Sequence, residues 1–161
     1  MTLYLVRHAK AHARNEWAGK DRLRPLSKRG RQQADALADA LADALADALA
    51  DGGVTRIVTS SFVRCRETVE PLARRLGIEV DESEALVEGA GFRDAVDLIE
   101  KLAGESAVLC SHGDVLGGVL RHFDRHGVAL DGDRLEKAST WVLDSEDAKV
   151  CRARYVPPPS I

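Results

Sequence analysis

Long apolar runs, cysteine and an excess of positive charge are all missing or scarce in this 161-residue sequence. Cys65, Cys110 and Cys151 are odd in number, widely spaced and without a CxxC pair, which argues against a disulfide framework and a thiolate metal site. No uncharged run approaches the roughly 18 residues that a membrane-spanning helix requires. Residues 1–7 lack the basic region of a secretory signal. We therefore expect a reduced, cytoplasmic protein.

The charge balance excludes two broad classes of partner. A net charge of −3 gives no general attraction to nucleic acid or to an anionic membrane. The 45% of hydrophobic residues is enough for the core of one ordinary domain. Because no linker divides the chain, we predict a single domain over residues 1–156. Residues 157–161, which include Pro157-Pro158-Pro159, are expected to form a frayed C-terminal tail.

Apolar runs of strand length alternate with helical patterns along the chain. Strands are predicted at Thr2–Val6, Arg56–Thr59, Ile78–Val80, Ala107–Ser111, Ser139–Leu143 and Val150–Tyr155. The last two can pair with each other. This order predicts an α/β three-layer sandwich, with a mostly parallel central sheet, helices on both faces and an antiparallel C-terminal edge. In such sheets ligands bind at the carboxyl ends of the strands.

Residues 34–51 repeat Ala-Asp-Ala-Leu almost without variation. Alanine and leucine favour helix, Ser27 is a good N-cap and Gly52-Gly53 supplies a stop, so we expect a helix of about 24 residues. The leucines recur every four residues and drift by about 40° per repeat, so one end of the helix should project beyond the core. A surface helix with a solvated acidic face accounts for the repeat. A docking surface for a basic partner or a second protomer is the alternative, and no local feature favours it.

Three predicted strands are followed by residues suited to phosphate. Arg7 and His8 follow the first strand, Arg64 comes shortly after the second, and His112 follows Ala107–Ser111. Arginine presents a planar fork of donors, and the backbone N–H groups of Gly113 and Asp114 would open a helix, which is a natural anion site. The helix that carries Arg64 should begin at Ser60 or Ser61, with Arg64 pointing inward and Arg66 away.

Two histidines and two arginines that converge on one sheet edge indicate covalent phosphoryl transfer through histidine. The loop that follows the first histidine adds a basic rim, which would steer an anionic substrate locally on an acidic protein. This rim consists of Lys10, His12, Arg14, Asn15, Lys20, Arg22 and Arg24.

These segments resemble the motifs of the histidine phosphatase superfamily, which also contains the cofactor-dependent phosphoglycerate mutases. Leu5–Ala9 resembles the RHG motif with alanine in place of glycine, a change that small members resembling bacterial phosphohistidine phosphatases tolerate. Asp21–Gly30 resembles R-P-L-T/S-x-x-G, Thr59–Thr68 resembles S-x-x-x-R-x-x-x-T, and Ser111-His112-Gly113 resembles the second histidine motif. The resemblance runs from residue 3 to about residue 118. The chain is also similar to phosphatase domains that occur alone or fused to a Nudix domain.

The resemblance implies a metal-independent phosphatase that needs no cofactor. It makes His8 the nucleophile, and it places Arg7, Arg64 and His112 on the phosphoryl oxygens. Flanking arginines would disfavour the imidazolium form of His8 and keep it nucleophilic.

Four further residues are candidates by position. Glu88 resembles the family's leaving-group acid, and Glu84 is the nearby competitor unless both merely solvate a loop. Where family members often carry a phosphate-binding asparagine, this chain has Arg14, with Asn15 one residue later.

The segment between Arg64 and Glu88 is short, so it leaves no long insertion to cover the substrate, and we predict an open site. Such a site suits a protein-borne phosphohistidine or another small exposed phosphoester. A nucleotide or small-metabolite phosphatase ranks second and a mutase third. A metallohydrolase using His8, His12, His112 and Asp114 ranks low, because the arginines would repel a divalent cation. A catalytically silent phosphate-binding module is the alternative from a different functional class.

Overall fold

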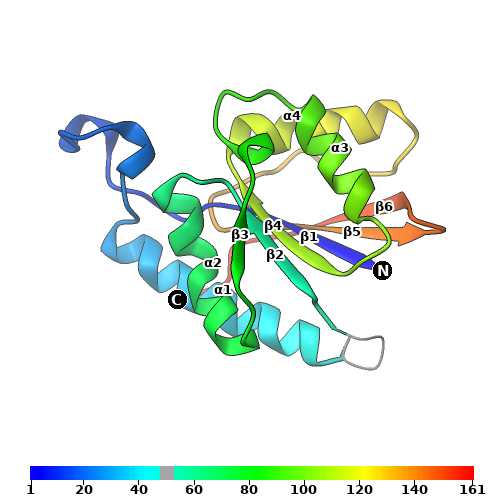
Figure 1. Ribbon diagram of the computed structural model, residues 1–161, viewed down its shortest axis with the longest axis horizontal. Coiled ribbons are helices and arrows are strands. Elements are labelled where there is room, and N and C mark those ends of the chain that lie inside the picture. Colours follow the sequence, from blue (N-terminus) through cyan, green and yellow to red (C-terminus); the bar gives the residue numbers. More distant parts are fainter. Residues whose placement is uncertain (48–52) are drawn as a thin grey trace.

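The computed structural model describes residues 1–47 and 53–161, in which six strands form one sheet (Figure 1). The strands are β1 (Thr2–Arg7), β2 (Arg56–Thr59), β3 (Val80–Glu82), β4 (Ala107–Ser111), β5 (Thr140–Glu146) and β6 (Lys149–Val156). Their order is β3-β2-β4-β1-β5-β6. The first four in this order run parallel, and β5 and β6 are antiparallel to their neighbours. The predicted α/β architecture with an antiparallel C-terminal edge is confirmed.

Helices cover both faces of this sheet. The helices α1 (Lys28–Asp47) and α2 (Val63–Leu76) pack on one face, while α3 (Arg93–Leu102) and α4 (Gly113–Arg125) pack on the other (Figure 1). Strand β1 shows why two cores form. Its alternate residues Leu3 and Leu5 belong to the core on the α3–α4 face, whereas Tyr4 and Val6 belong to the core on the α1–α2 face.

The strand register brings three carboxyl ends together. Arg7 at the end of β1 lies opposite Ser111 at the end of β4, and Thr59 at the end of β2 lies opposite Cys110. The chain continues this pairing one residue further, because the His8 N–H donates to the Ser111 carbonyl over 3.1 Å. The residues that follow these strands therefore share one edge of the sheet.

The repeat helix begins as predicted, because the Ser27 hydroxyl accepts the Gly30 N–H over 3.1 Å. Leu37, Leu41 and Leu45 are all buried. Three residues at this spacing spread over about 80°, which still fits one apolar stripe. Leu49 and the predicted stop at Gly52 lie outside the described residues, so the projecting end stays a prediction.

Several boundaries differ from expectation. Strand β1 ends at Arg7 rather than at Val6, β5 covers Thr140–Glu146 rather than Ser139–Leu143, and β6 covers Lys149–Val156 rather than Val150–Tyr155. Helix α2 begins at Val63 rather than at Ser60 or Ser61, because the Ser60 hydroxyl accepts the Phe62 N–H over 3.2 Å and holds the chain in a turn first. Strand β3 begins at Val80 rather than at Ile78. Of the helices in residues 1–47 and 53–161, none is both long enough and apolar enough to cross a membrane.

Candidate active site

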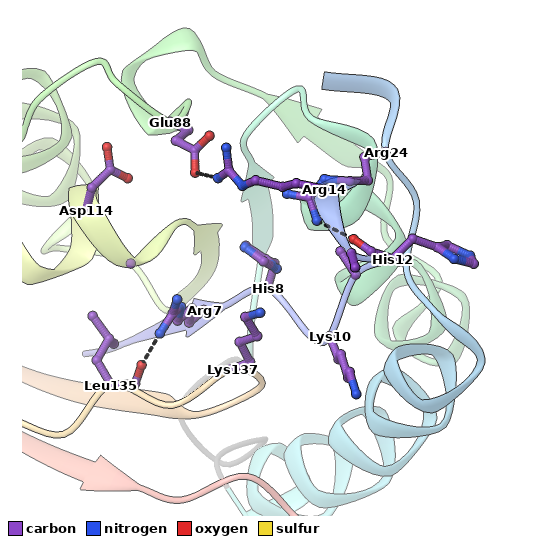
Figure 2. A pocket seen from close by; sticks show the side chains of 13 residues that line it. Arg7, His8, Lys10, His12, Arg14, Arg24, Glu88, Asp114, Leu135 and Lys137 are labelled. Atoms are coloured by element: carbon purple, nitrogen blue, oxygen red, sulfur yellow. Dashed lines mark hydrogen bonds and ion pairs between the residues drawn. The ribbon is translucent and has the colours of Figure 1, made fainter. Parts of the chain in front are cut away.

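A cavity of about 510 Å³ opens at the carboxyl ends of β1 and β4. Figure 2 shows the side chains that line it. Arg7 and His8 come from the end of β1, and Gly113 and Asp114 come from the start of α4. Loop residues from 10 to 24, Glu88, and the segment before β5 complete the wall. The cavity thus lies where parallel α/β sheets bind ligands.

His8 is a buried imidazole that presents one free nitrogen. Its Nδ1 lies 2.7 Å from the carbonyl oxygen of Ala9, which can only accept, so Nδ1 carries the proton and the Nε2 lone pair is free. The Ala9 N–H donates to the Thr68 hydroxyl over 3.0 Å, which anchors this turn of the chain to α2.

Burial is the largest cause that lowers the pKa of His8, which falls to about 3. The hydrogen bond to Ala9 opposes this shift, and the nearby His112, Arg64 and Arg7 add to it. His8 is therefore a neutral imidazole at physiological pH, as a nucleophile must be.

Arg7 lies against the first turn of α4. Its Nη1 donates to the Leu135 carbonyl over 2.6 Å. A Cβ atom added at Gly113 would lie 2.9 Å from the Arg7 Cζ, so any side chain there would displace the guanidinium from its present position. The group that lies directly against Gly113 is therefore Arg7.

Arg64 is fully buried and held by two acidic residues. Its Nη1 donates to the Asp21 carbonyl over 2.9 Å, and its Nη2 contacts the Asp21 carboxylate at 3.1 Å and the Glu88 carboxylate at 3.2 Å. By contrast, Arg66 is partly exposed and pairs with Glu70 and Glu82. Arg64 is therefore the arginine of this helix that faces the site.

Asp21 also holds Arg24, whose Nε lies 3.0 Å from the same carboxylate. Burial raises the pKa of Asp21, but the hydrogen bonds and charges of Arg24 and Arg64 outweigh burial and hold the pKa below its usual value. A charged Asp21 thus orients both arginines.

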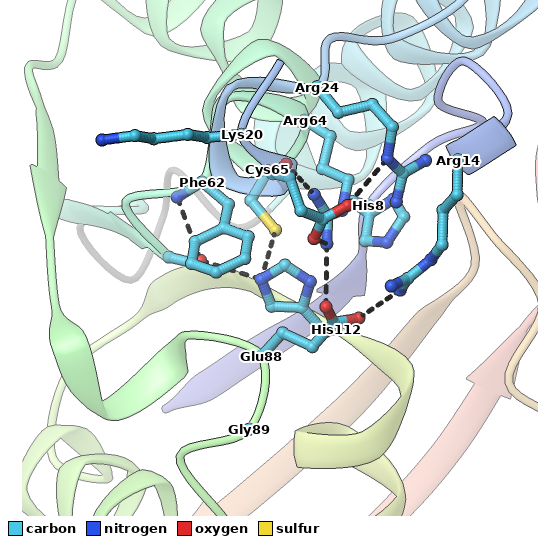
Figure 3. Close-up of polar contacts among 12 residues, drawn as sticks. His8, Arg14, Lys20, Arg24, Phe62, Arg64, Cys65, Glu88, Gly89 and His112 are labelled. Atoms are coloured by element: carbon cyan, nitrogen blue, oxygen red, sulfur yellow. Dashed lines mark hydrogen bonds and ion pairs between the residues drawn. The ribbon is translucent and has the colours of Figure 1, made fainter. Parts of the chain in front are cut away.

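His112 lies beside His8, with ring centroids 5.3 Å apart. Its Nε2 is 2.9 Å from the Ser60 hydroxyl and 3.4 Å from the sulfur of Cys65 (Figure 3). Cys65 is buried and contacts this histidine. The other ring nitrogen, Nδ1, is buried and has no partner within the described residues. In Figure 3 that nitrogen is on the side of the ring nearer to His8.

Glu88 bridges two arginines at the mouth of the site. One carboxylate oxygen lies 3.0 Å from Arg14 and the other 3.2 Å from Arg64 (Figure 3). The adjacent Gly89 N–H donates to the Asp114 carboxylate over 2.9 Å, which ties this loop to α4. Glu84 does not line the cavity and instead accepts a hydrogen bond from Ser61.

Several buried nitrogen atoms of these residues have no hydrogen-bond partner. Within residues 1–47 and 53–161 such atoms include the Arg7 Nε, the Arg64 Nε and the His112 Nδ1. Leaving a buried donor unpaired costs about 1–3 kcal/mol. Unpaired donors thus follow three separate strand ends, which indicates a site that can bind an anion.

The structure brings most of the predicted site residues together, but only some of them line the cavity. Arg7, His8, Arg14, Glu88 and Gly113 line the cavity. Arg64 and His112 lie behind its wall, buried against Glu88 and His8. Of Arg14 and Asn15, Arg14 lines the cavity and Asn15 does not.

Sequence reasoning missed Asp21 as a holder of Arg64, and it missed Lys137 in the cavity wall. Lys137 is brought there by its neighbour, because the Ala138 N–H bonds to the carbonyls of Arg7 and His8 at 3.1 and 3.2 Å. The predicted strand beginning at Ser139 was the available signal, since its N-terminus meets the end of β1 once the two strands pair.

The four residues considered as metal ligands do not form a ligand cluster. Across the described ranges, no group of three or more His, Cys, Asp or Glu side chains is arranged to hold a metal ion. The cations that surround His8 in this structure are guanidinium and ammonium groups.

The chain is similar in sequence to a known protein family and to a curated protein. The model of the histidine phosphatase superfamily, branch 1, matches residues 3–92. The 8-oxo-(d)GTP phosphatase of Mycolicibacterium smegmatis is 35% identical over 164 residues, a match that covers 98% of this chain and 48% of that protein. The chain therefore spans about half the length of this curated relative.

Solved structures share the fold at low sequence identity. The protein histidine phosphatase SixA in complex with tungstate has a TM-score of 0.75 and 16% identity, over 99% of this chain and 97% of that chain. A mycobacterial glucosyl-3-phosphoglycerate phosphatase has a TM-score of 0.68 and 17% identity, over 99% of both chains.

Proposed function

Since the chain belongs to the histidine phosphatase superfamily, we propose that it is a metal-independent phosphatase that works through a covalent intermediate on His8. The observation that carries this proposal is the state of His8: neutral, buried, protonated on Nδ1, and next to Arg7 and Arg64. The guanidinium groups supply the positive charge that a metal ion would otherwise provide.

In the first step, the lone pair of His8 Nε2 attacks phosphorus and the bond to the leaving group breaks. Arg7, Arg64 and the Nδ1 of His112 bind the equatorial oxygens, which accounts for their unpaired nitrogen atoms. Phosphoryl oxygens compete with Glu88 for Arg14 and Arg64, which frees the carboxyl group to face the leaving group. Glu88 is the residue that would then protonate a departing oxygen or nitrogen.

In the second step, water attacks the phosphorus of phospho-His8 and gives up a proton to Glu88. The bond to Nε2 breaks, inorganic phosphate leaves, and His8 returns to its starting form. Glu88 therefore serves as acid and then as base.

Two substrate classes fit an open cavity at this site. A phosphohistidine borne by a protein could reach His8 without an enclosing lid. A nucleotide is favoured by the 35% identity to an 8-oxo-(d)GTP phosphatase, which extends over nearly all of this chain.

The proposal is tested with p-nitrophenyl phosphate and EDTA-treated protein. We expect turnover to survive the chelator, and quenched reactions to contain phosphoprotein that is stable in base and labile in acid. The His8→Ala variant should lose turnover and phosphoprotein together. His12→Ala is the matched control and should keep most activity, because the His12 side chain points away from His8 (Figure 2).

Three results would contradict the proposal. Loss of activity with EDTA would favour metal chemistry. Equal losses in the two histidine variants would remove the assignment of His8. A protein that turns over no aryl or histidyl phosphate would be a phosphate-binding module.

A further inference from the structure

We propose that Lys10 and Lys137 form a second anion subsite, and that the substrate is a compound ending in two linked phosphates, of which the terminal one is transferred to His8. The inference rests on the proposed function and names its substrate class. The side chains around the cavity carry more positive charge than one phosphoryl group requires.

The ion pairs of the cavity leave specific cations without a carboxylate. Arg14 pairs with Glu88, and Arg24 pairs with Asp21. Arg7, Lys10 and Lys137 form no salt bridge within the described residues. Of the acidic groups that line the cavity, Asp114 accepts the Gly89 N–H and its charge also acts on Arg7. The lining nevertheless holds five arginine and lysine side chains against two acidic ones, so positive charge is in surplus on the cavity wall.

Lys137 lies within the field of other cations rather than facing an acid. Burial lowers the pKa of its ammonium group, and so do the charges of Arg7, Arg24, Lys10 and Arg14. Figure 2 shows Lys137 between Arg7 and Lys10, below His8 and across the cavity from Glu88. Such crowding of like charges is unfavourable unless an anion binds there.

The transferred phosphoryl group already has its own donors. The unpaired nitrogen atoms of Arg7, Arg64 and His112 can bind its oxygens, which leaves Lys10 and Lys137 for a further anionic group. A phosphohistidine side chain or an aryl phosphate has no such group next to the transferred phosphorus. A phosphoanhydride has one, one bridging oxygen away, and lysine is a common phosphate binder as a point charge.

The chemistry of the step is consistent with this placement. Attack of His8 Nε2 on the terminal phosphorus breaks the anhydride bond, and the bridging oxygen leaves with the electron pair on the second phosphate. The lysines stabilise that negative charge directly, so this leaving group needs no proton from Glu88. Water then attacks the phosphorus of phospho-His8 and gives its proton to the Glu88 carboxylate, the bond to Nε2 breaks, and inorganic phosphate leaves.

The test compares GDP, GMP and p-nitrophenyl phosphate as substrates of the wild-type protein, Lys137→Met and Lys10→Met. The wild type should show a kcat/KM for GDP at least about tenfold above that for GMP. Each lysine variant should lose about 10- to 100-fold in kcat/KM for GDP, mainly through KM, which corresponds to one charged hydrogen bond. Its kcat/KM for p-nitrophenyl phosphate should change by less than about threefold.

Lys101→Met is the matched control, because Lys101 is an exposed lysine of α3 that does not line the cavity, and it should behave as the wild type with all three substrates. Equal losses on GDP and p-nitrophenyl phosphate would overturn the second subsite, and so would a wild type that hydrolyses GDP no faster than GMP. In either case phosphoprotein on His8 would still form, which distinguishes this failure from failure of the proposed function.

Discussion

At the scale of single residues, the neutrality of His8 has a different main cause from the one expected. The adjacent arginines were expected to disfavour its charged form. They do contribute, but burial contributes more. His8 is only 6% exposed, so it would be neutral even with weaker neighbouring charges. The arginines are thereby available for the phosphate.

This burial predicts a pH-dependent stability. The unfolded chain takes up a proton on His8 near pH 6.5, whereas the folded chain does so only near pH 3. Between these values the unfolded state binds the extra proton, so stability is lost as the pH falls. The contribution is at most about 1.4 kcal/mol per pH unit.

Urea unfolding at pH 6.5 and 4.5 measures this effect. The free energy of unfolding of the His8→Asn variant should fall less over this interval than that of the wild type, by up to about 2 kcal/mol. His12→Asn should keep the wild-type dependence, because His12 is exposed. Identical pH dependence in wild type and His8→Asn would show that His8 is not held neutral by the fold.

Site residues were predictable where they directly follow a strand. His8 and His112 follow strands whose apolar residues mark them clearly, and parallel strands align their carboxyl ends. Asp21 and Lys137 were not predictable in this way. Asp21 reaches Arg64 across a loop contact, and Lys137 reaches the cavity only through the pairing of β5 with β1.

At the scale of secondary-structure elements, the start of α4 offers a sharp test of the site. In the Gly113→Ala variant the new Cβ would meet the Arg7 Cζ at 2.9 Å, so the flexible Arg7 side chain must move. We expect kcat/KM for p-nitrophenyl phosphate to fall about 100- to 1,000-fold, as for the loss of an oxyanion donor, while unfolding stays cooperative.

Gly117→Ala is the control in the same helix. Its Cβ would meet only the end of the Arg121 side chain, at 3.3 Å. That variant should keep its activity and gain up to about 1 kcal/mol in stability, because alanine favours helix over glycine. Wild-type kcat/KM in Gly113→Ala would mean that the position of Arg7 beside α4 does not matter for phosphate binding.

The sequence predicts the bounds of an element correctly where the pattern of its side chains alone determines them. Strands β2 and β4 match their predicted ranges because each is an apolar run that ends in polar residues. The start of α2 did not, because the Ser60 hydroxyl bonds both the Phe62 N–H and His112. The serine that predicted the start of a helix therefore forms a turn next to the site instead.

At the scale of the whole molecule, the sign of the charge differs between the protein and its cavity. The chain carries a net charge of −3, yet arginine and lysine side chains dominate the cavity wall. The acidic residues of α1, by contrast, do not line the cavity. An approaching anion therefore meets two opposing fields, and the nearer one should dominate within a screening length of about 10 Å.

The dependence of kcat/KM on ionic strength shows which of the two fields governs encounter with the substrate. If the cavity governs encounter, raising potassium chloride from 20 to 300 mM should lower kcat/KM about 3- to 10-fold, since salt screens the attraction. If the net charge governed encounter, the same salt would screen a repulsion and raise kcat/KM. The decrease should be steeper for GDP than for p-nitrophenyl phosphate, and Lys137→Met should flatten it for GDP in particular. A kcat/KM that rises with salt would show that the basic wall does not guide the substrate.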